Sequence, residues 1–147
     1  MISAEASVEI ARPVADVFRF VADPANEPAW HTDVISGRLE PAGEPGAGKV
    51  LHGRFKAFGR TADAVADVTT FEPDRRIVYA FRAATFGLRP TLTYSFERVD
   101  AGTRFTRRVD AEPFGVFRIL APIMGGQIAK RSAGFVQNLK RRLESQS

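Results

Sequence analysis

The sequence contains no cysteine and only two histidines among its 147 residues. Disulfide bonds and thiolate metal sites are therefore excluded, and a zinc site would have to rest largely on carboxylates. We predict a protein that uses no metal and no other cofactor.

Long apolar runs are also missing. No stretch approaches the ~18 consecutive apolar residues that a membrane span needs. The opening residues, MISAEASVEIARP, lack the basic region and apolar block that are typical of a secretory signal. We therefore expect a soluble, cytoplasmic protein without a membrane span.

The chain lacks a concentrated block of one charge, although its net charge is +4 and its pI is near 10.0. Such a balance is often seen in nucleic-acid-binding proteins, whose clustered basic residues displace counterions from phosphates. Here the basic residues are dispersed. The densest group lies on a predicted C-terminal helix with an apolar opposite face: Lys130, Arg131, Lys140, Arg141 and Arg142. We interpret it as a solvated helix surface and predict no nucleic-acid partner.

One segment comes close to a phosphate-binding loop. Residues 43–50, GEPGAGKV, fit the pattern G-x-x-x-x-G-K-[ST] except at Val50, where the hydroxyl that ligates magnesium should stand. A phosphate-binding loop also leads into a helix, whereas the residues that follow alternate as in a strand. We predict a glycine-rich turn and no nucleotide site.

Hydrophobic periodicity divides the chain into strands and helices. Residues 2–10 alternate between apolar and polar side chains, and the helical spacing of Val14, Val17, Phe18 and Val21 follows. Pro24 and Pro28 end regular helix soon afterwards. Six strand-like runs then occupy residues 34–40, 49–57, 62–71, 76–83, 89–98 and 103–111, and a helical period covers residues 115–145.

The connections between these runs are short, which favours antiparallel neighbours because a parallel crossover needs a dozen or more residues. An antiparallel sheet must cover its apolar face, and the C-terminal helix is long enough to do so. The sequence therefore predicts an α+β fold in a single domain, residues 1–147. A curved, seven-stranded antiparallel sheet would wrap around the long C-terminal helix, with two short helices after the first strand.

Strand alternation also predicts which side chains face the inside. The inward set combines large aromatic residues with small ones, and small residues beside large ones indicate either tight helix packing or an unfilled apolar cavity. Both interpretations remain open at this point. The inward set includes Leu51, Gly53, Phe55, Ala62, Ala64, Ala66, Val68, Ile77, Tyr79, Phe81, Leu92, Tyr94, Phe96, Phe105 and Val109.

Arg107 shares the inward phase of Phe105 and Val109, although an unpaired buried charge is costly. It could reach solvent at the sheet edge, pair with a carboxylate of the protein, or bind an acidic or carbonyl group of a ligand. His31, next to Trp30, could lie at the surface or at a cavity mouth.

Several fragments together resemble the START-related SRPBCC superfamily, which includes polyketide cyclases/dehydrases and the birch-pollen allergen. They are VEIARPVADVFRFVADPANEPAWHTDV, VTTFEPDRRIVY, YSFERVDAGTRFTRRVDAEP and the closing helix. The resemblance implies a helix-grip fold with an apolar tunnel between sheet and helix, and no universal catalytic residue. Trp30 matches the usual aromatic after the second short helix, and Gly102 with Thr103 matches the turn before the last strand. Arg107 departs from the apolar or aromatic residue that we expect there.

The resemblance and the inward phases predict that the broken helix and Trp30 form the tunnel rim. The apolar residues 113–126 would act as a lid or as a dry approach to the helix. The predicted ligand-binding residues are Trp30, His31, Phe55, Tyr79, Phe81, Tyr94, Phe96, Arg107, Met124 and Phe135.

Three functions remain open. The first is binding or transport of a small hydrophobic or aromatic molecule. The second is an enzyme such as a polyketide cyclase or dehydratase, but no inward polar group is paired by spacing with a carboxylate, and the catalytic residues are unknown. The third is an interaction or co-chaperone-like module that docks a partner through residues 113–126. The sequence does not decide whether the chain forms a homodimer.

Overall fold

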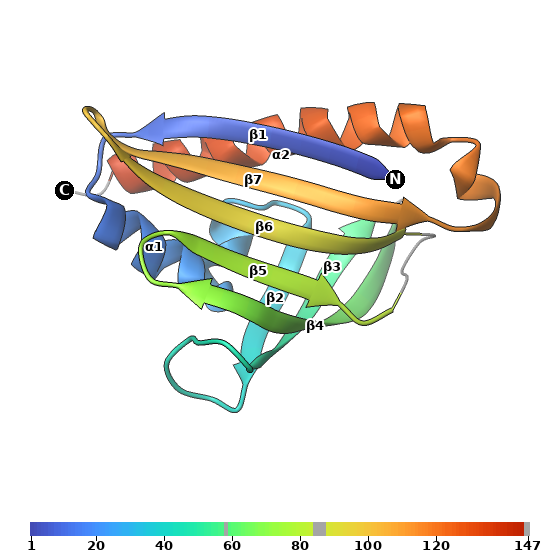
Figure 1. The fold of residues 1–147 in the computed structure, drawn as a ribbon, viewed down its shortest axis with the longest axis horizontal. Coiled ribbons are helices and arrows are strands. Elements are labelled where there is room, and N and C mark those ends of the chain that lie inside the picture. Colours follow the sequence, from blue (N-terminus) through green and yellow to red (C-terminus); the bar gives the residue numbers. More distant parts are fainter. Residues whose placement is uncertain (58, 84–87, 146–147) are drawn as a thin grey trace.

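The strands form a curved antiparallel sheet, and a long helix lies on its inner face (Figure 1). The computed structural model describes residues 1–57, 59–83 and 88–145, and the strand order within them is β1-β7-β6-β5-β4-β3-β2. The predicted fold class is confirmed. The elements are β1 (Ile2–Ile10), α1 (Val14–Ala22), η1 (Pro24–Ala29), β2 (Val34–Glu40), β3 (Val50–Ala57), β4 (Arg60–Glu72), β5 (Arg76–Phe81), β6 (Leu88–Val99), β7 (Gly102–Pro113), η2 (Gly115–Arg118) and α2 (Ala121–Glu144).

The core lies between β1, the centre of the sheet and the C-terminal half of α2. On β1 the alternation of the sequence becomes alternation of burial: Ile2, Ala4, Val8 and Ile10 are buried, and the residues between them are mostly exposed. The buried side chains of α2 are Ser132, Phe135, Val136, Leu139 and Leu143. The second half of α2 therefore fixes the helix against the sheet.

Two short helices connect β1 to β2. Pro13 precedes the first turn of α1, where its missing N–H costs no hydrogen bond. η1 is a 3-10 helix that begins at Pro24, and the Asp23 carboxylate accepts a hydrogen bond of 3.0 Å from the Ala25 N–H. η1 packs against β2, where a Cβ on Gly37 would lie 3.0 Å from the Pro24 carbonyl oxygen. This close approach fixes the start of η1 against β2.

The prediction of a single helix over residues 115–145 is wrong at the start of that range. Residues 115–118 form the separate 3-10 helix η2, and α2 begins only at Ala121, with Pro122 in its first turn. Gly115 has a φ of +60°, outside the right-handed helical region, so the chain turns before the helix begins. By contrast, Val50 begins strand β3 directly after Lys49, as predicted for the glycine-rich turn.

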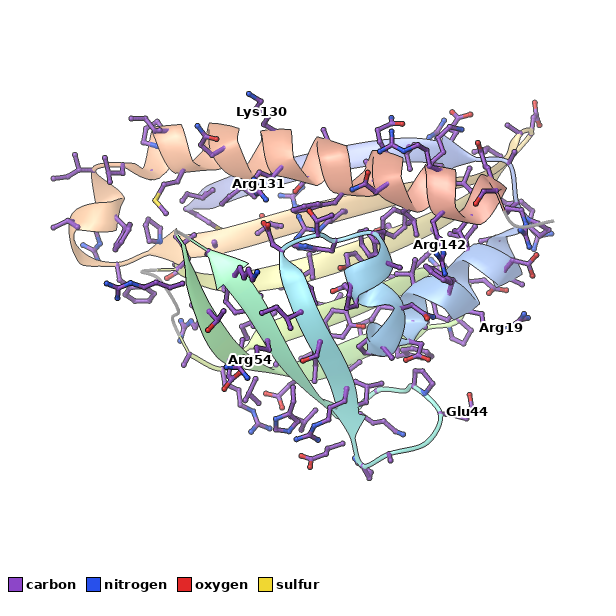
Figure 2. All side chains as sticks on the ribbon, turned by 180° about the vertical axis from the view of Figure 1, so that it is seen from behind. Arg19, Glu44, Arg54, Lys130, Arg131 and Arg142 are labelled. Atoms are coloured by element: carbon purple, nitrogen blue, oxygen red, sulfur yellow. The ribbon has the colours of Figure 1, made fainter. Side chains whose placement is uncertain are left out.

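Many basic residues are held in ion pairs on the outer face of the sheet. Arg104 pairs with Glu9 and Glu97, and Arg108 pairs with Asp110 and Glu5. On α2, Lys130 points away from the sheet (Figure 2). Apart from the buried Arg107, the described basic side chains are thus spread over the surface. None of the described helices is both long and apolar enough to cross a membrane.

Candidate functional site

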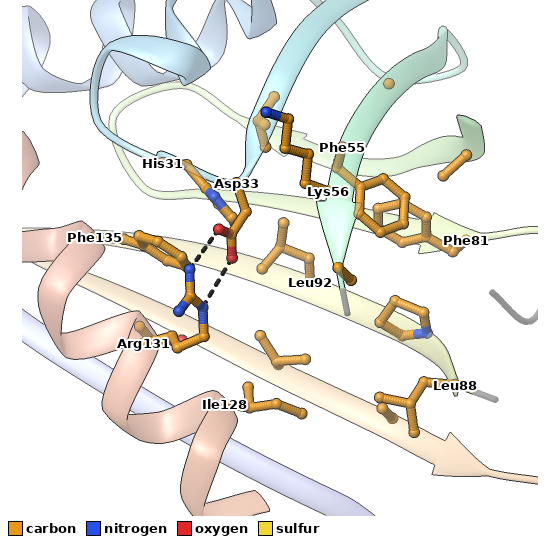
Figure 3. Close-up of a pocket in the computed structure, with 18 of the residues that line it drawn as sticks. His31, Asp33, Phe55, Lys56, Phe81, Leu88, Leu92, Ile128, Arg131 and Phe135 are labelled. Carbon is orange, nitrogen blue, oxygen red and sulfur yellow. Dashed lines mark hydrogen bonds and ion pairs between the residues drawn. The ribbon is translucent and has the colours of Figure 1, made fainter. Parts of the chain in front are cut away.

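A cavity of about 900 Å³ lies between the inner face of the sheet and the N-terminal half of α2 (Figure 3). In this half of the helix Ala121, Met124 and Ile128 are only half-buried, whereas the inward-facing side chains of the second half, from Ser132 to Leu143, are buried. The helix and the sheet therefore do not meet completely. This hollow decides between the two packing alternatives left open by the sequence.

The cavity wall is largely apolar. Small residues leave room on the sheet side, since Gly53 on β3 stands directly opposite Ala64 on β4, and both line the cavity. Larger side chains surround these two small residues; they come from β3, β5, β6, β7, α2 and the residue before α2. They include Leu51, Phe55, Phe81, Leu88, Leu92, Val109, Leu120, Ile123, Met124, Ile128 and Phe135.

Six of the ten predicted ligand-binding residues line this cavity: His31, Phe55, Phe81, Arg107, Met124 and Phe135. The other four, Trp30, Tyr79, Tyr94 and Phe96, are buried in the packed core beside it. We therefore remove these four from the set of proposed ligand contacts.

Trp30 shows why the predicted tunnel rim needs correction. Its side chain is fully buried, with the rings of Tyr94 and Phe105 at centroid distances of 5.7 and 5.9 Å. Trp30 thus anchors the broken-helix segment in the core instead of forming a rim. The segment still reaches the cavity, but through Pro24, Glu27 and His31.

A group of polar side chains, which we call the polar cluster, lies at and directly behind the cavity wall. Four of its members line the cavity, namely Glu27, His31, Arg107 and Ser132, and the fifth, Tyr94, is buried behind them. Arg107 donates hydrogen bonds to the Ser132 hydroxyl and, over 3.2 Å, to Nε2 of His31. Alternation correctly places Arg107 inward, where only 7% of its surface is exposed.

Phe135 closes one side of the polar cluster. The His31 ring stacks on the Phe135 ring at 3.9 Å between centroids, and the Arg107 guanidinium carbon lies 5.5 Å from the Phe135 ring centroid. The aromatic face attracts the cation and shields it from solvent. Phe135 on α2 therefore helps to hold the side chains of β7 and of the segment after η1 in place.

His31 is uncharged in this environment. Burial, followed by the nearby charges of Arg107 and Arg131, holds its pKa well below the ordinary value of 6.5. Arginine has only donors, so Nε2 of His31 is the acceptor and its proton is on Nδ1. That Nδ1 is buried, and within residues 1–57, 59–83 and 88–145 it has no hydrogen-bond partner.

Glu27 and Tyr94 form a carboxyl–phenol pair that the sequence spacing does not reveal. The Tyr94 hydroxyl donates a hydrogen bond of 2.9 Å to Oε1 of Glu27. Burial raises the pKa of Glu27 from 4.5 to about 6, although the Tyr94 hydrogen bond and the charge of Arg107 both act to lower it. The one signal of this pair in the sequence is the inward phase of Tyr94, because a buried tyrosine hydroxyl usually has a hydrogen-bond partner.

The Glu27 shift predicts a pH-dependent stability. A carboxyl group with a raised pKa in the folded state adds stability below pH 4.5, and this contribution is lost as the pH rises through 6. The difference in pKa corresponds to about 2 kcal/mol at most. From about pH 4 to pH 7.5, we expect the wild-type free energy of unfolding to fall by about 1 to 2 kcal/mol relative to that of Glu27→Gln. Urea unfolding of both proteins at both pH values measures this difference, and a constant difference would contradict the burial of the carboxyl group.

Charged residues also stand at the cavity wall near His31. The Arg131 guanidinium on α2 donates to both carboxylate oxygens of Asp33, with 2.9 Å between Nε and Oδ2 (Figure 3). This pair joins α2 to the segment before β2. Within the described parts of the chain, no group of three or more His, Asp or Glu side chains could hold a metal ion.

Comparison with known families gives a match over most of the chain. The model of a family described as polyketide cyclase / dehydrase and lipid transport matches residues 1–144. Among curated proteins, none matches the chain.

Solved structures share the fold at low sequence identity. A protein of Thermus thermophilus has a TM-score of 0.80 and 17% identity, with 99% of each chain covered. The di-domain ARO/CYC BexL from the BE-7585A biosynthetic pathway has a TM-score of 0.79 and 19% identity over 98% of this chain and 47% of its own. A protein of Deinococcus radiodurans has a TM-score of 0.72 and 16% identity, with 98% of each chain covered. Similarity at these identities shows the fold alone.

Proposed function

Because the chain belongs to the polyketide cyclase / dehydrase and lipid transport family, we propose that it binds a small, largely apolar or aromatic molecule in the cavity between the sheet and α2. The observation that carries this proposal is the cavity itself. Its volume of about 900 Å³ and its apolar wall with a few polar groups are typical of small-molecule sites.

The side chains at the start of α2 support the same function. Its first half presents Met124 and Ile128 to the cavity, and Leu120 and Ile123 at its start are exposed while they line the opening. Flexible methionine side chains adapt to ligands of different shape. An apolar molecule would cover surface that is otherwise exposed to water.

Two measurements test the proposal. Native mass spectrometry of the purified protein, before and after denaturation, would reveal a bound hydrophobic molecule. For protein without such a molecule, titration with the neutral fluorophore N-phenyl-1-naphthylamine should give saturable binding at one site and a blue-shifted emission. The absence of both a released molecule and saturable fluorophore binding would reject the proposal.

The second candidate function is an enzyme that acts on a polyketide-like ring. Glu27 favours it, since a cavity-lining carboxyl group with a pKa of about 6 can both accept and donate a proton near neutral pH. The neighbouring Arg107 could stabilise negative charge that develops on a substrate oxygen. A turnover assay with aromatic polyketide analogues would decide between carriage and catalysis.

The interaction-module interpretation stays a prediction. Around η2 and the start of α2 the exposed apolar side chains are Phe114, Val116, Ile119, Leu120 and Ile123. This surface adjoins the cavity opening, because Leu120 and Ile123 also line the cavity.

A further inference from the structure

We propose that the ligand carries an acidic oxygen, such as that of a carboxylate or an ionised phenol, and that Arg107 binds this oxygen inside the cavity. This inference rests on the proposed function, because it concerns the same cavity. It narrows the ligand class from any apolar molecule to an apolar or aromatic weak acid.

The first argument is the charge of Arg107. Its side chain is charged at every physiological pH, yet it is almost completely buried. A buried charge is costly unless it is paired and hydrogen-bonded. Among the residues that the structure describes, the hydrogen-bond partners of Arg107 are the neutral Ser132 hydroxyl and the neutral His31 ring, and no carboxylate forms an ion pair with it.

The second argument is the set of unused donors. Nε of Arg107 and Nδ1 of His31 are both buried, and neither has a hydrogen-bond partner among the described residues. Both are N–H donors, because Nε2 of His31 is the acceptor for Arg107. Both residues line the cavity, so a ligand oxygen that reached either N–H would satisfy a donor that a purely hydrocarbon ligand leaves without a partner.

The third argument compares Arg107 with the other charged groups at the cavity wall, of which Arg54 and Lys56 on β3 are exposed to solvent. The Arg131 guanidinium is already paired with Asp33. The Glu27 carboxyl group interacts with Arg107 through space, but its hydrogen bond comes from Tyr94, and burial opposes its ionisation. The positive charge of Arg107 is therefore not neutralised by a direct contact within the described residues.

Two fluorophores with the same aromatic skeleton provide the test. Anilinonaphthalene sulfonate carries an acidic oxygen group, and N-phenyl-1-naphthylamine does not. We expect Arg107→Met to reduce the ratio of sulfonate affinity to amine affinity by about tenfold or more, since hydrogen bonds to charged groups are among the strongest. Fluorescence titration measures both dissociation constants.

Arg108→Met is the matched control. Arg108 is the next residue of β7, its side chain lies on the outer face of the sheet, and it is ion-paired with Asp110 and Glu5. The substitution removes the same charge without touching the cavity, so the affinity ratio should stay within about twofold of that of the wild type. A similar loss in both variants would indicate a long-range charge effect and overturn the proposal.

The remaining outcomes are also decisive. An unchanged ratio in folded Arg107→Met would overturn the proposal while leaving the proposed function intact. If neither fluorophore binds the wild type and denaturation releases no hydrophobic molecule from it, the proposed function itself fails. Should Arg107→Met not fold, competition against N-phenyl-1-naphthylamine in the wild type replaces it: naphthoate should bind about tenfold more tightly than naphthamide, and equal binding would overturn the proposal.

Discussion

Replacing Gly102 by alanine is expected to lower the free energy of unfolding by about 3 kcal/mol or more. Gly102 begins β7 with a φ of +141°, which side-chain-bearing residues rarely adopt. A Cβ at this position would collide with the Ile10 carbonyl oxygen and would lie 2.8 Å from the backbone N and O of Arg12. Urea unfolding measures the loss.

The neighbouring backbone has little freedom to move aside. Ile10 is the last residue of β1 and pairs with Thr103, and the Thr103 hydroxyl donates a hydrogen bond of 2.8 Å to the Arg12 carbonyl oxygen. Relief of the collision would therefore break contacts between β1 and β7, which support the core. This is the physical reason for glycine at the turn that the sequence resemblance identified.

Gly126→Ala is the control, because it makes the same chemical change in a different environment. Gly126 lies inside α2, and a Cβ there would meet no atom within 4 Å. Alanine is the better helix former, so this variant should gain about 0.5 to 1 kcal/mol. A loss at Gly102 below about 1 kcal/mol would show that the turn adjusts freely, contrary to the expected strain.

The fold was predictable because its signals are local. Apolar and polar residues alternate on β1, and the connections between strands are short, so the sequence specifies antiparallel strands. The structure has the same alternation of burial and the same strand pairing. The start of α2 was missed because apolar periodicity continues through residues 114–120, where the side chains are largely exposed. Periodicity reports which residues are apolar and does not report whether a neighbouring element covers them.

The site was only partly predictable, because its contacts join distant segments. Alternation correctly placed Arg107 inward, but its partners Ser132 and His31 are 25 and 76 positions away in the chain. Glu27 and Tyr94 are separated by 67 positions, so their pairing had no signature in the spacing. Family resemblance located Trp30 near the site without revealing that its ring turns into the core.

The double substitution Ala64→Trp and Val109→Trp should weaken binding of N-phenyl-1-naphthylamine by about a hundredfold, equivalent to about 2.7 kcal/mol. Ala64 on β4 and Val109 on β7 are both buried and both line the cavity. Two indoles that project from different strands would occupy the space that the ligand needs. Because the indoles fill an existing hollow, the thermal unfolding midpoint should not fall. It does fall when a larger side chain is forced into a core that is already packed.

A matched double variant separates cavity filling from the mere addition of tryptophan. Val65→Trp and Arg108→Trp add the same two indoles one position along each strand, where strand alternation directs side chains to the outer face. This variant should bind the fluorophore with an affinity within about threefold of the wild type. If the cavity-filling variant is folded and binds as tightly as this control, the fluorophore must bind elsewhere. The exposed apolar side chains of η2 and the start of α2 would then be the site to examine, and the cavity would lose its proposed role.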